Sequence, residues 1–217
     1  MIKALLFDLD GVIVSTDDCH YHAWKQLADR EGIYFDREIN ERLRGVSRME
    51  SLAIILERAH KNFSEEEKKK MAAWKNERYV ELLDSITPDD ILPGVLEWLD
   101  YLEKRKIKTA IASSSRNAKI ILKRLDMENA FDAVVDGNDI ENSKPHPEVF
   151  LKAAENVGFA PAECLVVEDA EAGVAAAVAA GSPCLAVGSA ANDTRASFSA
   201  NTLADVSPAE IIGSNIL

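Results

Sequence analysis

The sequence predicts an α/β fold, a Rossmann-like doubly wound parallel sheet core interrupted by an inserted all-helical domain. Three observations lead to this prediction. Ala4 to Phe7 form a short apolar run that is typical of a buried strand. Residues from about 17 to 86 show helical periodicity and no convincing strand. From about residue 88, strand-like runs alternate with helices, which indicates right-handed βαβ units and a parallel sheet.

The first strand has the character of the second half of the chain, so we expect both to form one core. The expected core comprises residues 1–15 and 88–217, and the expected insert comprises residues 16–87. The segments 14–16 and 87–88 are then the hinges between them.

Within the insert, apolar side chains recur at helical spacing. Two stripes carry this pattern: Ala23, Trp24, Leu27 and Ala28, then Leu52, Ile55, Leu56 and Ala59. Ser64 followed by Glu67 is a capping-box pattern, and it predicts a helix that runs through Trp74 and Tyr79 to Leu83.

The second half alternates in order. A helix is expected to open at Pro93-Gly94, another to include 120–125, a third to run from Pro147 to near Gly158, and a fourth to cover 173–180. Strands are expected at 107–112, 133–135, 165–167 and 184–187. The tail beyond Val187 is rich in Ser, Ala and Asn and shows no recognisable chemistry.

Composition excludes several function classes. The 37 acidic and 25 basic residues give a net charge of −12, which disfavours nucleic acid and anionic membranes as partners. Three cysteines without a CxxC pair suggest neither a disulfide framework nor a zinc site. Met1-Ile-Lys leads directly into the first strand, so we expect no signal peptide and a cytoplasmic protein. No apolar stretch is long enough to span a bilayer.

Two carboxylates, Asp8 and Asp10, follow the first strand, and Gly11 comes next. Burying such charges costs several kcal/mol unless a cation or hydrogen bonds compensate. Ligand sites of open α/β sheets lie beyond the carboxyl ends of the strands. The pair therefore suggests a nucleophile, an acid/base, a metal ligand or a mixture, although a strand followed by a solvated acidic turn has the same pattern.

Three more polar clusters follow core strands. Ser113 to Asn117 begin a helix, where free amides and hydroxyls favour an anion, although an ordinary helix cap looks the same. Lys144 stands between Ser143 and Pro145, either to neutralise a phosphoryl oxygen or as a surface lysine. Glu168-Asp169 either hold a hard cation such as Mg²⁺ or simply favour a helix N-terminus.

The order of these four clusters resembles the haloacid dehalogenase superfamily of phosphoryl-transfer enzymes over essentially the whole chain. The resemblance implies that Asp8 is the nucleophile that forms an aspartyl-phosphate and that Asp10 is the general acid/base. It implies that Ser113 and Lys144 bind the transferring phosphoryl group. It also implies one Mg²⁺ ion, with metal ligands at Asp8, Asp10, Glu168 and Asp169.

The insert resembles that of the sugar-phosphate mutases of this superfamily, and the similar segments are Thr16 to Lys25, Leu43 to Arg48 and Trp74 to Asn76. The resemblance implies an isomerase that interconverts β-glucose 1-phosphate and glucose 6-phosphate through β-glucose 1,6-bisphosphate, with the insert as a cap. Thr16, His20 and Lys75 are implied catalytic residues, and the latter two position Asp10. The implied substrate-binding residues are Trp24, Gly45, Val46, Ser47, Arg48, Ser114, Ser115, Arg116 and Asn117.

Two other functions remain open. A cap-bearing phosphatase acting on sugar phosphates or phosphoglycolate would use the same core residues, and only the cap discriminates it. A catalytically idle protein that binds Mg²⁺ and phosphate is the second, and the intact set of core residues argues against it.

Several residues also have plain structural interpretations. His20 and Trp24 fit an ordinary helix and a cap core, Arg48 fits a surface ion pair, and Lys75 fits a solvated helix face. Ser15 replaces the aspartate that commonly precedes the hinge threonine of this superfamily. We expect small-molecule partners only, a sugar phosphate and a bisphosphate, and a monomer.

Overall fold

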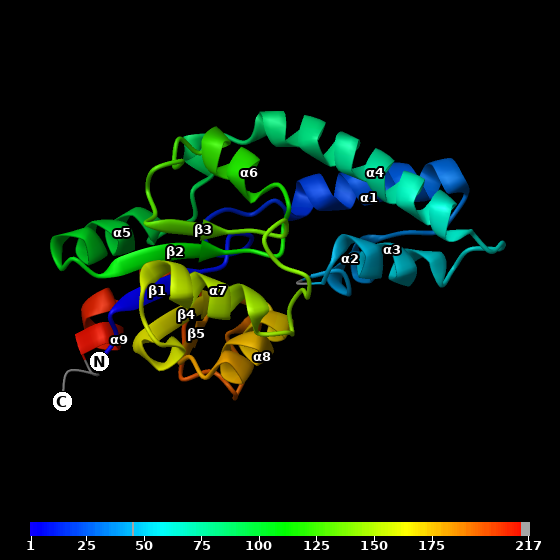
Figure 1. Cartoon of the computed structure of the whole chain (residues 1–217). Helices are drawn as coiled ribbons and strands as arrows, with labels where there is room; N and C mark the ends of the chain where they lie inside the picture. The colour runs from blue at the N-terminus through cyan, green and yellow to red at the C-terminus, as the bar shows by residue number, and fades with distance from the viewer. Residues whose placement is uncertain (45, 214–217) are drawn as a thin grey trace.

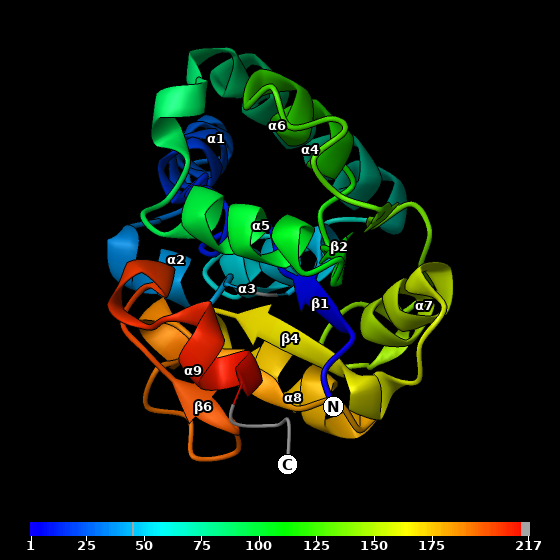
Figure 2. The same ribbon diagram turned by 90° about the vertical axis from the view of Figure 1, so that its left-hand side faces the viewer.

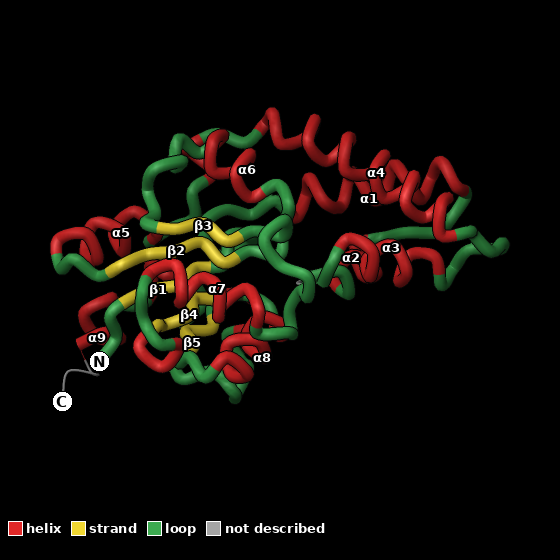
Figure 3. Tube along the Cα trace, in the orientation of Figure 1, coloured by secondary structure: helices red, strands yellow, loops and turns green. Residues whose placement is uncertain are grey.

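The computed structural model describes residues 1–44 and 46–213. Six parallel strands form one sheet in the order β3-β2-β1-β4-β5-β6. Figures 1 and 3 show this sheet at one end of the molecule and helices α1–α4 together at the other. The described part of the chain contains no helix long and apolar enough to cross a membrane.

The strands occupy short apolar runs separated by helices, as the alternation predicts. Their bounds are β1 Ala4–Phe7, β2 Lys108–Ala112, β3 Ala133–Val135, β4 Cys164–Glu168, β5 Cys184–Ala186 and β6 Phe198–Ser199. The core helices are α5 Val95–Lys104, α6 Ala118–Arg124, α7 Glu148–Val157, α8 Glu171–Ala180 and α9 Pro208–Gly213. β6 and α9 were not predicted from the sequence, because elements of two and six residues are too short to show periodicity.

The two faces of the sheet are covered by different helices, which makes the fold doubly wound. Leu5 and Phe7 of β1 pack in one apolar cluster with residues of α5, α6 and α9. Ala4 and Leu6 point to the opposite face and pack with residues of α7 and α8. Figure 2 shows β1 and β4 between α5 and α8. The near-continuous burial of β1 and β4 is what a sheet covered on both faces requires.

The helical segment contains α1 Asp17–Glu31, α2 Arg37–Glu41, α3 Arg48–Leu56 and α4 Glu65–Leu82, and a 3₁₀ turn Leu83–Ser85 follows α4. Its helices have an apolar cluster of their own, which includes Trp24, Leu27, Leu52 and Ile55 from the two predicted stripes. The capping box of α4 is confirmed, since Ser64 Oγ accepts from the Glu67 amide at 3.3 Å and Glu67 Oε2 accepts from the Ser64 amide at 2.8 Å.

Candidate active site

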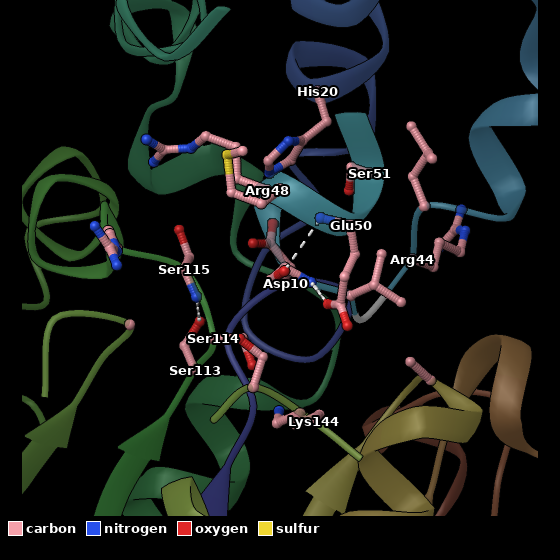
Figure 4. Close-up of a pocket in the computed structure, with 18 of the residues that line it drawn as sticks. Asp10, His20, Arg44, Arg48, Glu50, Ser51, Ser113, Ser114, Ser115 and Lys144 are labelled. Carbon is pink, nitrogen blue, oxygen red and sulfur yellow. Dashed lines mark hydrogen bonds between the residues drawn. The ribbon is translucent and has the colours of Figure 1, made fainter. Parts of the chain in front are cut away.

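The carboxyl ends of β1, β2 and β4 lie side by side, because β1 pairs in parallel with both neighbours. Phe7 is in register with Ile111 and Val167, so the residues that follow leave the sheet at one edge. Asp8, Ser113 and Glu168 are therefore brought together although about 160 residues separate the first from the last. Figure 4 shows Asp10, Ser113 and Lys144 at this edge, with Arg48 and His20 across the pocket.

An acidic cluster lies at the centre of the edge. Carboxylate oxygens of Asp8, Glu168 and Asp169 all lie within 4.8 Å of one another. Lys144 Nζ donates to Asp8 Oδ1 at 2.6 Å and to Glu168 Oε1 at 2.5 Å. Burial lowers the pKa of Lys144, but the two carboxylates outweigh burial and raise the pKa above its usual value. Lys144 is thus a fixed cation, only 3% exposed.

One lysine does not balance these acids. Burial raises the pKa of Asp169 to about 8, and the neighbouring Glu168 and Asp8 add to the effect. Burial also raises the pKa of Glu168 despite its contact with Lys144. Excess negative charge on hard oxygen ligands fits a divalent cation such as Mg²⁺.

Two glycines let the carboxylates approach the backbone. A Cβ on Gly11 would lie 2.0 Å from Asp169 Oδ2, and a Cβ on Gly173 would lie 1.8 Å from Glu168 Oε1. Gly11 also has a φ of +78°, which disfavours other residues at this turn. The acidic cluster therefore depends on both glycines.

Asp10 stands apart from the three clustered acids, because its carboxylate is bound elsewhere. Thr16 Oγ1 donates a short hydrogen bond to Asp10 Oδ1, and Tyr79 OH lies 2.9 Å from the same hydroxyl. Burial raises the pKa of Asp10 to about 7, an effect opposed by the Thr16 hydrogen bond and increased by Asp8. A carboxyl with this pKa can give and take a proton near neutral pH.

Lys75 is buried in the helical segment without a carboxylate partner among the described residues. Its Nζ lies 2.8 Å from His20 Nδ1 and 4.6 Å from the ring centroids of both Trp24 and Tyr79. Burial, followed by the charge of Arg48, lowers the pKa of Lys75. Burial and then Lys75 lower the pKa of His20. Both shifts favour the neutral forms of these side chains, and the contribution of Arg48 to each shift shows that its positive charge reaches this part of the cavity.

Arg48, the first residue of α3, and Arg116, in the loop between β2 and α6, both line the cavity. Burial lowers the pKa of Arg48, and the charge of Arg116 lowers it further. Neither guanidinium makes an ion pair with a carboxylate in the described ranges 1–44 and 46–213. Two unpaired guanidinium groups near one another are suited to a phosphate.

The loop after β2 provides hydroxyls and amides beside Arg116. Ser113 Oγ accepts from the Ser115 amide at 3.1 Å, and Ser115 Oγ accepts from the Asn117 amide at 3.2 Å. Ser114 Oγ is buried without a partner in the part of the chain described here. These bonds curl the loop, so that its polar groups converge on the space in front of it.

A single cavity of about 1000 Å³ joins all these groups. All the described residues that were predicted for the site line this cavity except Thr16, which does not line it but donates a hydrogen bond to Asp10. Gly45 was predicted too and lies outside the described residues. Ser47 lines the cavity as the N-cap of α3, where its Oγ accepts from the Glu50 amide at 3.3 Å.

Arg44, Asn76 and Tyr79 also line the cavity, although they were not predicted from the sequence as site residues. Arg44 makes ion pairs with Asp17, with Glu41 at 2.8 Å and with Asp169 at 3.7 Å. Tyr79 stands four positions after Lys75 on α4, so helical spacing from Lys75 could have identified it, whereas Asn76, at the next position, has no such spacing.

Comparisons with known proteins agree with this geometry. The family described as haloacid dehalogenase-like hydrolase matches residues 2–181. The chain is 44% identical to the β-phosphoglucomutase of Bacillus subtilis over 189 residues, which cover 86% of this chain and 84% of that protein. It is 34% identical over 215 residues, 97% of both chains, to a phosphorylated carbohydrates phosphatase of Thermotoga maritima.

The solved structures give the same result. The crystal structure of β-phosphoglucomutase from Clostridium difficile has a TM-score of 0.92 and 41% sequence identity, and the match covers 98% of this chain and 96% of that one. The fold predicted from the sequence is therefore confirmed.

Proposed function

Because the chain belongs to the haloacid dehalogenase-like hydrolase family, we propose that its cavity catalyses the β-phosphoglucomutase reaction, the interconversion of β-glucose 1-phosphate and glucose 6-phosphate. One observation carries the proposal: the acidic cluster around Asp8 lines the same cavity as Arg48 and Arg116, which form no ion pair with any carboxylate of residues 1–44 and 46–213. A mutase needs two phosphate sites, because its bisphosphate intermediate must turn around between two transfers.

Asp8 is the nucleophile. Lys144 holds one of its carboxylate oxygens, which leaves the other to attack phosphorus and form an aspartyl-phosphate. Lys144 and Ser113 contact the phosphoryl oxygens, on which negative charge is spread during transfer. The phosphorylated enzyme then gives its phosphoryl group to the 6-hydroxyl of β-glucose 1-phosphate, and later takes one back from the 1-position.

Asp10 moves the proton in both transfers. Its carboxylate accepts the proton of the attacking sugar hydroxyl in one direction and returns it to the leaving oxygen in the other. The pKa of about 7 leaves both forms accessible near neutral pH. Thr16 fixes one oxygen of the carboxylate, and Tyr79 in turn fixes Thr16.

We further propose Mg²⁺ as the cofactor, held by Asp8, Glu168 and Asp169. The sequence also predicted Asp10 as a metal ligand, but the carboxylate of Asp10 does not belong to this cluster. When bound, Mg²⁺ would neutralise charge on the transferring phosphoryl group. Arg48 and Arg116 bind the phosphate that does not react, and Ser114, Ser115 and Asn117 assist them.

The helical segment, residues 16–87, acts as a cap that moves on hinges near Ser15 and Thr87. Closure excludes water, which would otherwise hydrolyse the aspartyl-phosphate. The monomeric state and the cytoplasmic location remain predictions from the sequence.

The proposal is tested by incubating the protein with Mg²⁺, β-glucose 1-phosphate and catalytic β-glucose 1,6-bisphosphate, and by measuring glucose 6-phosphate and free phosphate together. We expect glucose 6-phosphate to dominate. Dominant release of phosphate would instead support a sugar-phosphate phosphatase, which the similarity to the Thermotoga maritima protein makes the second candidate.

A further inference from the structure

A hydrogen bond crosses the cavity between the helical segment and the sheet core. Nδ2 of Asn117 donates to Oδ1 of Asn76 at 2.8 Å. Asn76 belongs to α4, and Asn117 is the N-cap residue of α6 directly after the loop that follows β2. Both side chains line the cavity.

The side chain of Asn117 is not used in the way its position favours. An asparagine at an N-cap usually accepts a hydrogen bond from one of the first amides of its helix. Asn117 makes no such bond, although it is only 8% exposed. Its amide group is therefore committed to the contact across the cavity.

The two asparagines also connect the two halves of the site. Asn76 follows Lys75 on α4. Tyr79 lies one turn further along the same helix, where its hydroxyl contacts Thr16, the hydrogen-bond partner of Asp10. Asn117 follows Arg116, whose charge acts on Arg48. The hydrogen bond joins the helix that supports the acid/base to the loop beside the arginines.

We propose that Asn76 is a positioning residue that couples cap closure to recognition of a second phosphate on the substrate. A primary amide carries two N–H donors. Asn76 accepts one from Asn117, which holds the amide of Asn117 in one orientation and leaves its second N–H for the nonreacting phosphate. The inference rests on the proposed function, because it assumes a substrate with two anionic ends.

The test compares substrates with and without a second phosphate. For Asn76→Ala we expect kcat/KM with β-glucose 1-phosphate on the phosphorylated enzyme to fall by about 2- to 13-fold, the range that loss of one hydrogen bond gives. We expect hydrolysis of acetyl phosphate, which has no second phosphate, to keep its rate. Alanine favours a helix more than asparagine, so the variant should fold. Glu77→Ala, at the exposed next position of α4, is the matched control and should change neither rate.

A double-mutant cycle with Asn117→Ala separates this role from a structural one. We expect the double variant to lose little more than Asn117→Ala alone, because Asn76 acts through Asn117. Additive losses, equal losses on both substrates or no loss would each overturn the inference. If the wild-type protein releases phosphate from sugar bisphosphates and forms no glucose 6-phosphate, the proposed function fails, while the same comparison on a sugar bisphosphate and acetyl phosphate still tests Asn76.

Discussion

The two ends of the cavity carry opposite excess charge. The acidic end is formed by the carboxyl groups of Asp8, Glu168 and Asp169. Lys144 contacts the first two, and Arg44 contacts only the third. The cationic end is formed by Arg48 and Arg116, with Lys75 beyond Arg48, and none of the three makes an ion pair with a carboxylate in the described ranges. Each end is electrostatically incomplete, and each calls for a different ligand: a divalent cation with a phosphoryl group at one, a phosphate at the other.

The largest effect is expected at the acidic end. Asp8→Asn should lower mutase turnover by on the order of 10⁵-fold, because an amide cannot form the phosphorylated intermediate. Production of glucose 6-phosphate measures it, and Asp89→Asn, an exposed acid outside the cavity, is the control. Retention of more than a hundredth of the activity would show that the acidic end does not supply the nucleophile.

The cationic end should respond in a different parameter. Arg48→Ala should raise the KM for β-glucose 1,6-bisphosphate by roughly 10- to 150-fold, the effect of losing a charged hydrogen bond. Hydrolysis of acetyl phosphate should change little. Arg42→Ala, which removes an exposed arginine paired with Glu57, is the matched control. An equal loss of activity on the bisphosphate and on acetyl phosphate would contradict separate roles for the two ends of the cavity.

A third experiment tests the excess negative charge at the acidic end through its effect on the free energy of unfolding. The raised pKa of Asp169, about 8, means that the folded protein binds an extra proton between about pH 4 and 8, so metal-free stability falls as the pH rises through this window. Asp169→Asn removes that carboxyl and should raise the free energy of unfolding at pH 8 by on the order of 1–3 kcal/mol in EDTA, with little effect near pH 4. Urea unfolding measures both.

Addition of Mg²⁺ provides the control for this experiment. It should stabilise the wild-type protein at pH 8 and stabilise the variant much less. An identical pH slope in the two proteins would contradict an uncompensated Asp169.

The smallest effect concerns the residue between the two ends. Asp10 must be protonated to transfer a phosphoryl group from the bisphosphate to Asp8, so kcat/KM for that half-reaction should fall above about pH 7. Thr16→Val removes a hydrogen bond that lowers the pKa of Asp10, and the alkaline limb should move up by roughly 0.5 to 1 pH unit. Thr194→Val, at an exposed position, should leave the limb in place. If the alkaline limb of the Thr16→Val profile moves to lower pH or stays in place, the limb reports the titration of a group other than Asp10.

The acidic end was easier to predict from the sequence than the cationic end. Asp8 follows β1 and Glu168 ends β4, and parallel strands bring such positions to one edge regardless of their distance along the chain. Lys144 was recognised by its place before a proline. The residues of the cationic end were assigned through the family resemblance, because a lysine or arginine on a helix has no local pattern that distinguishes a buried side chain from a solvated one.

Arg44 and Asn76 were not assigned to the site for a related reason. Their roles depend on how the helical segment meets the core, and this contact is made between residues that neither strand order nor periodicity relates. The contact of Asn76 with Asn117 joins residues 41 positions apart on different elements. In the same way, the short β6 and α9 are stabilised by packing on the sheet rather than by local sequence.

The central place of β1 has a consequence for how the protein is made. The ribosome synthesises this strand first, but its two neighbours, β2 and β4, end at residues 112 and 168. Helices α1–α4 emerge early and have an apolar cluster of their own to bury. The nascent chain can therefore pack its cap while the strand that carries Asp8 still lacks both partners, and the catalytic edge is assembled last.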